Sequence, residues 1–106
     1  MMRDWHPDLK RRLRREVLRI LSTNHGQQQS RPDDVALCHW LRALAWEVDL
    51  ADVVTIVQEM QGRGWVKYRQ FKDTILGRRV QLLEIEITPE GQDVFDQITP
   101  SPAVEF

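Results

Sequence analysis

Few side chains in this sequence have the type and spacing that catalysis or metal binding requires. Zinc sites need three or four ligands at defined spacings, whereas this chain has one cysteine, Cys38, and three histidines without paired-ligand spacing. The carboxylate pair Asp33-Asp34 precedes an apolar helical pattern and is explained by helix-start chemistry. The sequence contains no nucleophile elbow, phosphate loop or metal-binding motif. We therefore predict that the protein is not an enzyme and holds no metal or cofactor, and that Cys38 has a structural role.

The charged side chains are more informative, because they are clustered along the chain. The 106 residues carry 15 Lys and Arg against 16 Asp and Glu, which gives a formal net charge of −1. The net charge is +4 over residues 1–24, −4 over 25–62, +5 over 63–81 and −6 over 82–106. Blocks of alternating sign predict separate charged faces. Two interpretations stay open: a nucleic acid binds the two basic blocks, or the blocks neutralise each other.

The spacing of apolar residues predicts the elements that position these groups. The apolar period is 3.6 up to residue 61 and 2 thereafter. We expect helices over 8–22, 31–45 and 49–61, strands over 65–69 and 82–88 joined by an extended tip, and a last helix from residue 89. A turn of three or four residues would join the second and third helices. This order predicts one mostly helical α+β domain over 1–106, with its core in 8–98 and a loose tail over 99–106.

Helix-cap residues and helix faces can also be predicted. Ser30 with Asp33 resembles a capping box at the start of the second helix, and Asp49 is a good N-cap for the third. In the first helix the apolar stripe is Leu9, Leu13, Val17, Ile20 and Leu21, opposite the cations Lys10, Arg11, Arg12, Arg14, Arg15 and Arg19. The exposed face of the third helix is predicted to hold Ala51, Asp52, Thr55, Gln58, Glu59 and Gln61.

The two predicted strands place charges of opposite sign on their outer face. Lys67 and Arg69 alternate outward on the first strand, as Glu84 and Glu86 do on the second. If they face each other across an antiparallel pair, they neutralise one another. The inner face of the second strand would then carry Leu83, Ile85 and Ile87.

Two local signatures give this order of elements a resemblance to a known family. Residues 57–66, VQEMQGRGWV, are similar to the end of a recognition helix that runs into a strand. Residues 85–95, IEITPEGQDVF, are similar to the strand, Thr-Pro-x-Gly step and helix that close the hairpin. Over residues 8–98 the chain resembles the winged helix-turn-helix domains of bacterial transcription regulators of the MarR, PadR and ArsR-like groups.

The resemblance implies a three-helix bundle, a two-stranded hairpin wing and a C-terminal helix, in a dimeric protein that binds double-stranded DNA. The third helix would enter the major groove, and the wing, residues 70–81, would contact the phosphate backbone. The implied DNA contacts are Thr55, Gln58, Arg63, Lys72, Arg78 and Arg79. The implied groove face carries no basic residue and two acidic ones, Asp52 and Glu59, which would meet a polyanion.

The acidic third helix favours an alternative, a winged-helix module that binds another protein. Such a module would dock through that helix or through the apolar side chains Phe71, Ile75 and Leu76, in a tip where polar residues are expected. An apolar cavity beside Trp40 or Trp46 would indicate a small-molecule ligand.

Composition also bears on location. No stretch approaches the roughly 20 apolar residues of a membrane span, and the first eight residues lack the apolar run of a secretory signal. A single cysteine excludes an internal disulfide and fits a reducing compartment. We expect a cytoplasmic protein without a membrane partner.

Overall fold

The computed structural model describes residues 5–23, 31–73, 79–97 and 101–104, and these form four helices and one antiparallel hairpin. The elements, in chain order, are α1 (Pro7–Thr23), α2 (Asp34–Ala43), α3 (Leu50–Gly62), β1 (Val66–Asp73), β2 (Arg79–Ile87) and α4 (Pro89–Phe95). The protein is therefore a mostly helical α+β structure, as the sequence predicts. Among the described helices, none is both long enough and apolar enough to cross a membrane.

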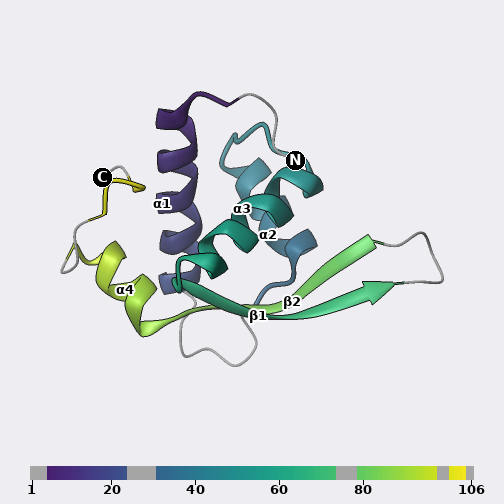
Figure 1. Cartoon of the computed structure of the whole chain (residues 1–106). Coiled ribbons are helices and arrows are strands. Elements are labelled where there is room, and N and C mark those ends of the chain that lie inside the picture. The colour runs from purple at the N-terminus through teal and green to yellow at the C-terminus, as the bar shows by residue number, and fades with distance from the viewer. Residues whose placement is uncertain (1–4, 24–30, 74–78, 98–100, 105–106) are drawn as a thin grey trace.

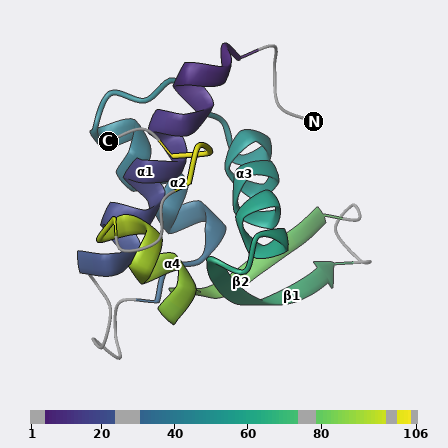
Figure 2. The ribbon, with the colours of Figure 1, turned by 60° about the vertical axis from the view of Figure 1, so that its left-hand side comes forward.

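The three longer helices pack together, and the hairpin extends away from them. In Figure 1, α2 and α3 lie beside α1, while the short helix α4 follows the end of β2. Figure 2 shows the hairpin projecting beyond the C-terminal end of α3. The core between them is built from fully buried apolar side chains of α1, α2, α3 and β2, among them Leu13, Val17, Leu18, Leu37, Leu41, Ile56, Met60, Leu82, Ile85 and Ile87.

The buried face of α1 differs from the predicted stripe at three positions. Leu18 is fully buried, whereas Leu9 is 43% exposed. Leu9 lies in the first turn of α1, where it faces an open cavity rather than another element. Arg14 is the third, because the structure buries it instead of leaving it among the exposed cations.

The helix α2 is shorter than the predicted range 31–45. Its N-cap is Asp33 rather than Ser30, which lies outside the described residues. The carboxylate of Asp33 accepts a hydrogen bond from the amide of Ala36 at 2.7 Å, which satisfies one of the free amides of the first turn. Asp34 is fully buried and its carboxylate accepts a hydrogen bond from the amide of Leu82 at 3.3 Å. The pair Asp33-Asp34 thus starts α2 and also joins it to β2.

The connection between α2 and α3 covers residues 44–49, longer than the predicted turn of three or four residues. Ala45 has a left-handed backbone with φ of 69°, which ends the helical path. The amide of Trp46 then donates to the carbonyl of Leu41 at 3.0 Å. Asp49 is the N-cap of α3, as predicted. The result is a turn held by its own hydrogen bonds, which fixes where α3 begins.

The strands are longer than predicted, so much of the expected tip is paired strand. β1 runs to Asp73 and β2 starts at Arg79, and these two residues are partners in the ladder. Between the pairs Lys67↔Glu86 and Arg69↔Leu83 the register shifts by one residue, and Glu84 has φ of 53°. This β-bulge turns Leu82 into the core in place of the predicted Leu83, because an extra residue on one strand reverses the alternation beyond it.

The Thr-Pro-x-Gly step joins the hairpin to α4 through close backbone contacts. Thr88 is the N-cap of α4, and its hydroxyl donates to the carbonyl of Gly64 at 2.6 Å and accepts from the amide of Gly91 at 3.1 Å. A Cβ at Gly91 would lie 2.1 Å from the carbonyl oxygen of Trp65. Glycine is therefore required where α4 crosses the start of the hairpin.

The sequence predicts a loose tail over residues 99–106, but part of the chain beyond α4 is packed against the helices. Within the described residues 101–104, Ala103 and Val104 are buried in the core. The guanidinium of Arg14 donates to the carbonyl oxygen of Ala103 at 3.1 Å. This segment folds back because it supplies both apolar surface and a hydrogen-bond acceptor for α1.

Candidate functional site

The solvent face of α3 carries small and uncharged polar side chains. Ala51, Thr55, Gln58 and Gly62 recur at helical spacing; Ala51 and Gly62 are exposed, while Thr55 and Gln58 are half-buried. The opposite side of the helix holds Val53, Ile56, Val57 and Met60 in the core. We call Ala51, Thr55, Gln58 and Gly62 the outer stripe of α3.

Asp52 does not belong to the exposed face on which it was predicted. It is 1% exposed, and its carboxylate accepts a hydrogen bond from the amide of Asp49 at 3.1 Å. The carboxylate of Asp49 in turn accepts from the amide of Asp52 at 2.8 Å. This is a reciprocal capping box, with Asp in the position where Glu is usual. The carboxylate of Asp52 therefore serves the start of α3 and does not face solvent.

Glu59, the second acidic residue predicted on the exposed face, forms ion pairs within the protein. Its carboxylate contacts the guanidinium of Arg14, and it lies 3.6 Å from that of Arg63. Its side chain is 34% exposed, and that of Arg14 is 10% exposed. The predicted position of Arg14 was wrong because its long side chain crosses from α1 to reach two acceptors on other segments. The negative charge of Glu59 is thereby balanced locally.

Of the predicted phosphate-binding cations, the structure describes Arg63 at the end of α3 and Lys72 on the hairpin. Arg63 is the C-cap residue of α3, and its guanidinium lies 5.4 Å from the ring centroid of Trp65, a cation–π contact that holds it near the helix end. Lys72 is exposed on β1. Arg79 begins β2, but its side chain and the whole of Arg78 lie outside what the structure describes.

The charged face of the hairpin is neutralised across the strands, as the sequence predicts. Lys67 lies 3.8 Å from Glu86, and Arg69 lies 3.4 Å from Glu84. Glu86 also pairs with Arg31, which precedes α2, at 3.3 Å. These exposed pairs contribute little to stability. They do confirm that the base of the hairpin, next to the end of α3, balances its own charge.

The apolar side chains predicted near the hairpin tip are only partly described. Phe71 is 54% exposed on β1, whereas Ile75 and Leu76 fall outside the described residues. A large exposed aromatic ring on a projecting strand is a candidate contact for another molecule.

Cys38 is buried in the core, and burial raises the pKa of its thiol. In the described part of the chain, no three His, Cys, Asp or Glu side chains come together in a way that could hold a metal ion.

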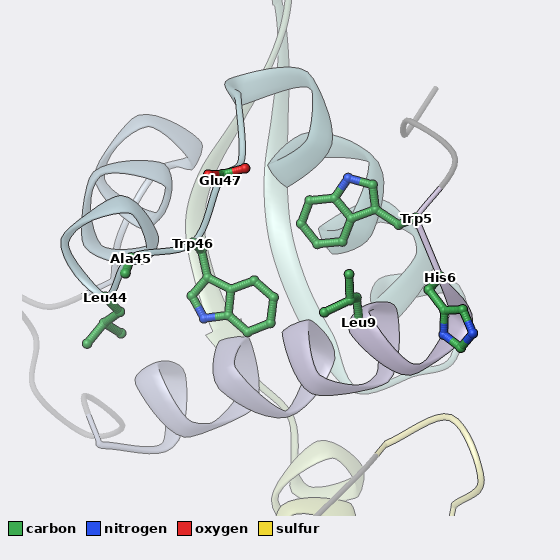
Figure 3. Close-up of a pocket in the computed structure, with 7 residues that line it drawn as sticks. All are labelled: Trp5, His6, Leu9, Leu44, Ala45, Trp46 and Glu47. Atoms are coloured by element: carbon green, nitrogen blue, oxygen red, sulfur yellow. The ribbon is translucent and has the colours of Figure 1, made fainter.

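A cavity of about 540 Å³ opens between the start of α1 and the turn after α2. Figure 3 shows its lining residues, which are Trp5, His6, Leu9, Leu44, Ala45, Trp46 and Glu47. The indole rings of Trp5 and Trp46 are nearly parallel, with 6° between their planes and centroids 6.1 Å apart. The sequence did not predict this cavity; it named Trp40 and Trp46 only as residues beside which one would be informative, and of the two Trp46 lines it. Trp5 gave no such hint, because only the fold brings the N-terminal segment to this turn.

Compared with models of known protein families, with curated proteins and with solved structures, the chain matches none.

Proposed function

We propose that the chain is a winged helix-turn-helix protein that binds double-stranded DNA. The order of the elements supports this proposal: β1 follows α3 after three residues, and the hairpin projects beside the end of α3 (Figure 2). In this arrangement α3 enters the major groove and the hairpin contacts the phosphate backbone. A homodimer would place two copies of α3 on successive half-sites about 34 Å apart.

The observation that carries the proposal is that the outer stripe of α3 carries no carboxylate, and that the two acidic side chains predicted beside it make contacts within the protein. Asp52 is buried in the capping box, and Glu59 is paired with Arg14 and Arg63. DNA attraction depends on cations that neutralise phosphates, and an exposed carboxylate in the groove would oppose it. Asp52 is held in the capping box, and the charge of the partly exposed Glu59 is balanced by Arg14 and Arg63, so α3 presents a nearly neutral surface to a groove.

Each group then has a role that follows from its position. Thr55 and Gln58 lie on the outer stripe and have the hydroxyl and amide groups that read base edges. Arg63 and Lys72 lie at the end of α3 and on β1, where they would contact phosphates. Arg78 and Arg79, which the sequence indicates as cations of the wing, would add further phosphate contacts.

The experiment is duplex binding by wild type and by two Gln→Glu variants. Gln58→Glu places a carboxylate on the outer stripe, and we expect it to weaken binding at least about tenfold, since a like charge near phosphates is repelled. Gln97→Glu makes the same change after α4, at an exposed residue outside the stripe, and should bind as wild type does. Equal binding by all three proteins would contradict the placement of α3 in the groove.

A second candidate function is a protein-binding module that uses the hairpin. The observation in its favour is the 54% exposed Phe71. This alternative also depended on an acidic surface of α3. That support is weaker, because Asp52 is buried and Glu59 is paired with Arg14 and Arg63. A wild-type protein that binds no duplex even at low salt would favour this candidate.

A further inference from the structure

We propose that the outer stripe of α3 reads A·T base pairs in the major groove, with Gln58 on adenine and the methyl groups of Ala51 and Thr55 on thymine. The inference rests on the proposed function and adds to it the class of duplex that the protein selects. Base pairs differ in the groups that they expose in the major groove, so the side chains of a helix that lies there determine which pairs it prefers.

The side chains that usually select G·C pairs are missing from α3 or are held by other residues. Guanine is read mainly by Arg or Lys, and the amino group of cytosine is read by Asp or Glu. The helix Leu50–Gly62 contains no Arg or Lys, and its Asp52 is buried in the capping box. The carboxylate of Glu59 pairs with Arg14 and Arg63. The charged side chains of α3 are therefore engaged within the protein and do not select a G·C pair.

The first cation after the outer stripe is Arg63, the C-cap residue of α3. Its guanidinium lies 5.4 Å from the ring centroid of Trp65 and 3.6 Å from the carboxylate of Glu59. These contacts hold its charge at the helix end, where the proposed function assigns it to a phosphate. Arg63 therefore adds no guanine reader to the outer stripe.

Gln58 has the hydrogen-bonding groups that match adenine. Its amide combines a donor and an acceptor, which pair with the N7 acceptor and the N6 amino group of adenine in a bidentate contact. Gln58 is half-buried, and among the described residues its amide has no hydrogen-bond partner. The same holds for the hydroxyl of Thr55. Neither group must break a bond to a described residue before it contacts a base.

Small side chains complete the outer stripe. Thymine carries a methyl group in the major groove, and the side-chain methyl groups of Ala and Thr make apolar contacts with it. Ala51 and Thr55 are four residues apart and therefore share one face of α3. At the exposed Gly62 an added Cβ would meet no atom within 4 Å, so this end of the helix can approach DNA closely. From Ala51 to Gln58 the helix advances about 10 Å, which fits a run of about three or four A·T pairs.

The test is selection by wild type from a pool of short duplexes of random sequence. We expect the selected duplexes to share a run of about three A·T pairs. Two base analogues then each remove one major-groove group from a selected duplex: uracil lacks the thymine methyl, and 7-deazaadenine lacks the N7 acceptor. We expect 7-deazaadenine to weaken binding at least about fivefold and uracil at least about twofold. Because both analogues leave the minor-groove edges unchanged, these losses distinguish reading of the major groove from recognition of duplex shape.

A matched pair of variants locates the reading residue. Gln58→Arg places a guanine reader on the outer stripe, and we expect the selected run to gain a G·C pair. Gln97→Arg makes the same change at an exposed residue after α4 and should select the same run as wild type. Binding by wild type without a preferred A·T run, equal affinity for duplexes with and without the analogues, or identical selection by both variants would overturn this inference and leave the proposed function standing. Absence of binding to the unselected pool even at low salt would overturn both.

Discussion

Arg14 is the residue whose replacement probes the fold and the candidate interface together. Its guanidinium donates to the carbonyl of Ala103 at 3.1 Å and pairs with Glu59 on α3. It therefore connects α1 with both α3 and the C-terminal segment. Arg14→Met removes the charge and both contacts but keeps an unbranched apolar stem of similar length.

The expected loss of stability follows from these two contacts. A hydrogen bond from a charged group in a buried setting contributes about 1.5–3 kcal/mol. The pair with Glu59 is partly exposed and adds at most about 1 kcal/mol. The Nε atom of Arg14 is buried without a hydrogen-bond partner among the described residues, and this desolvation subtracts from the total. We expect Arg14→Met to lower the free energy of unfolding by about 2 kcal/mol.

The assay is urea unfolding followed by circular dichroism, with Arg12→Met as the control. Arg12 is exposed on the same helix, so solvent screens its contacts and the same substitution there should change the free energy of unfolding by less than about 1 kcal/mol. A double-mutant cycle with Glu59→Gln separates the ion pair from the contact with Ala103. If Arg14→Met is as stable as Arg12→Met, the contacts of Arg14 do not hold the three segments together, and the reasoning is refuted.

Three further predictions concern single residues. Gly91→Ala should lower the free energy of unfolding by about 2 kcal/mol or more in urea titrations, because its Cβ would collide with a backbone carbonyl 2.1 Å away. Gly62→Ala changes a helical glycine at which an added Cβ would meet no atom within 4 Å, so it should be neutral or stabilising. An equal loss of stability in both variants would contradict the collision argument. Asp34→Ala should cost about 1–3 kcal/mol by the same measurement, since it leaves a buried amide of β2 without its acceptor; a change below about 0.5 kcal/mol would show that this bond contributes little. The hydrogen bond with Arg19 lowers the pKa of Glu16, so the pair stabilises the fold above the ordinary pKa of a glutamate and loses this contribution as the pH falls through the lowered value. Glu16→Gln should therefore lower the thermal midpoint slightly at neutral pH and not at pH 2, and a constant difference would exclude this linkage.

Sequence patterns predict the order of the elements because each element carries its own local signals. The apolar period of α3, the N-cap Asp49 and the terminating Gly64, which has φ of +80°, all lie within a few residues of the helix they define. The register and the inward face of the strands were harder to predict, because the bulge at Glu84 depends on pairing with β1. Nothing in the residues beside Glu84 indicates that an extra residue is accommodated there, so the inward face of β2 was assigned to Leu83 instead of Leu82.

The charged residues of the candidate interface show a different limit of sequence reasoning. A helical face predicts where a side chain starts, but the long side chain of Arg14 ends on α3 and on the C-terminal segment. Asp52 was predictable in principle, because it stands three residues after the N-cap Asp49, the spacing of a capping box. Trp5 gave no usable signal, because its partner Trp46 is distant in the sequence and meets it only in the folded chain.

The central claim is that α3 and the hairpin bind DNA, and the most direct measurement is the salt dependence of binding to a labelled generic duplex. We expect wild type to bind with a Kd of about 10⁻⁴–10⁻⁶ M, weakening steeply with salt. The variant Arg78→Ala/Arg79→Ala should bind more weakly and show a salt slope smaller by about 2, because each phosphate contact contributes about 0.9 to the slope. Absence of duplex binding by wild type at low salt, or a variant with an unchanged slope, would contradict the account.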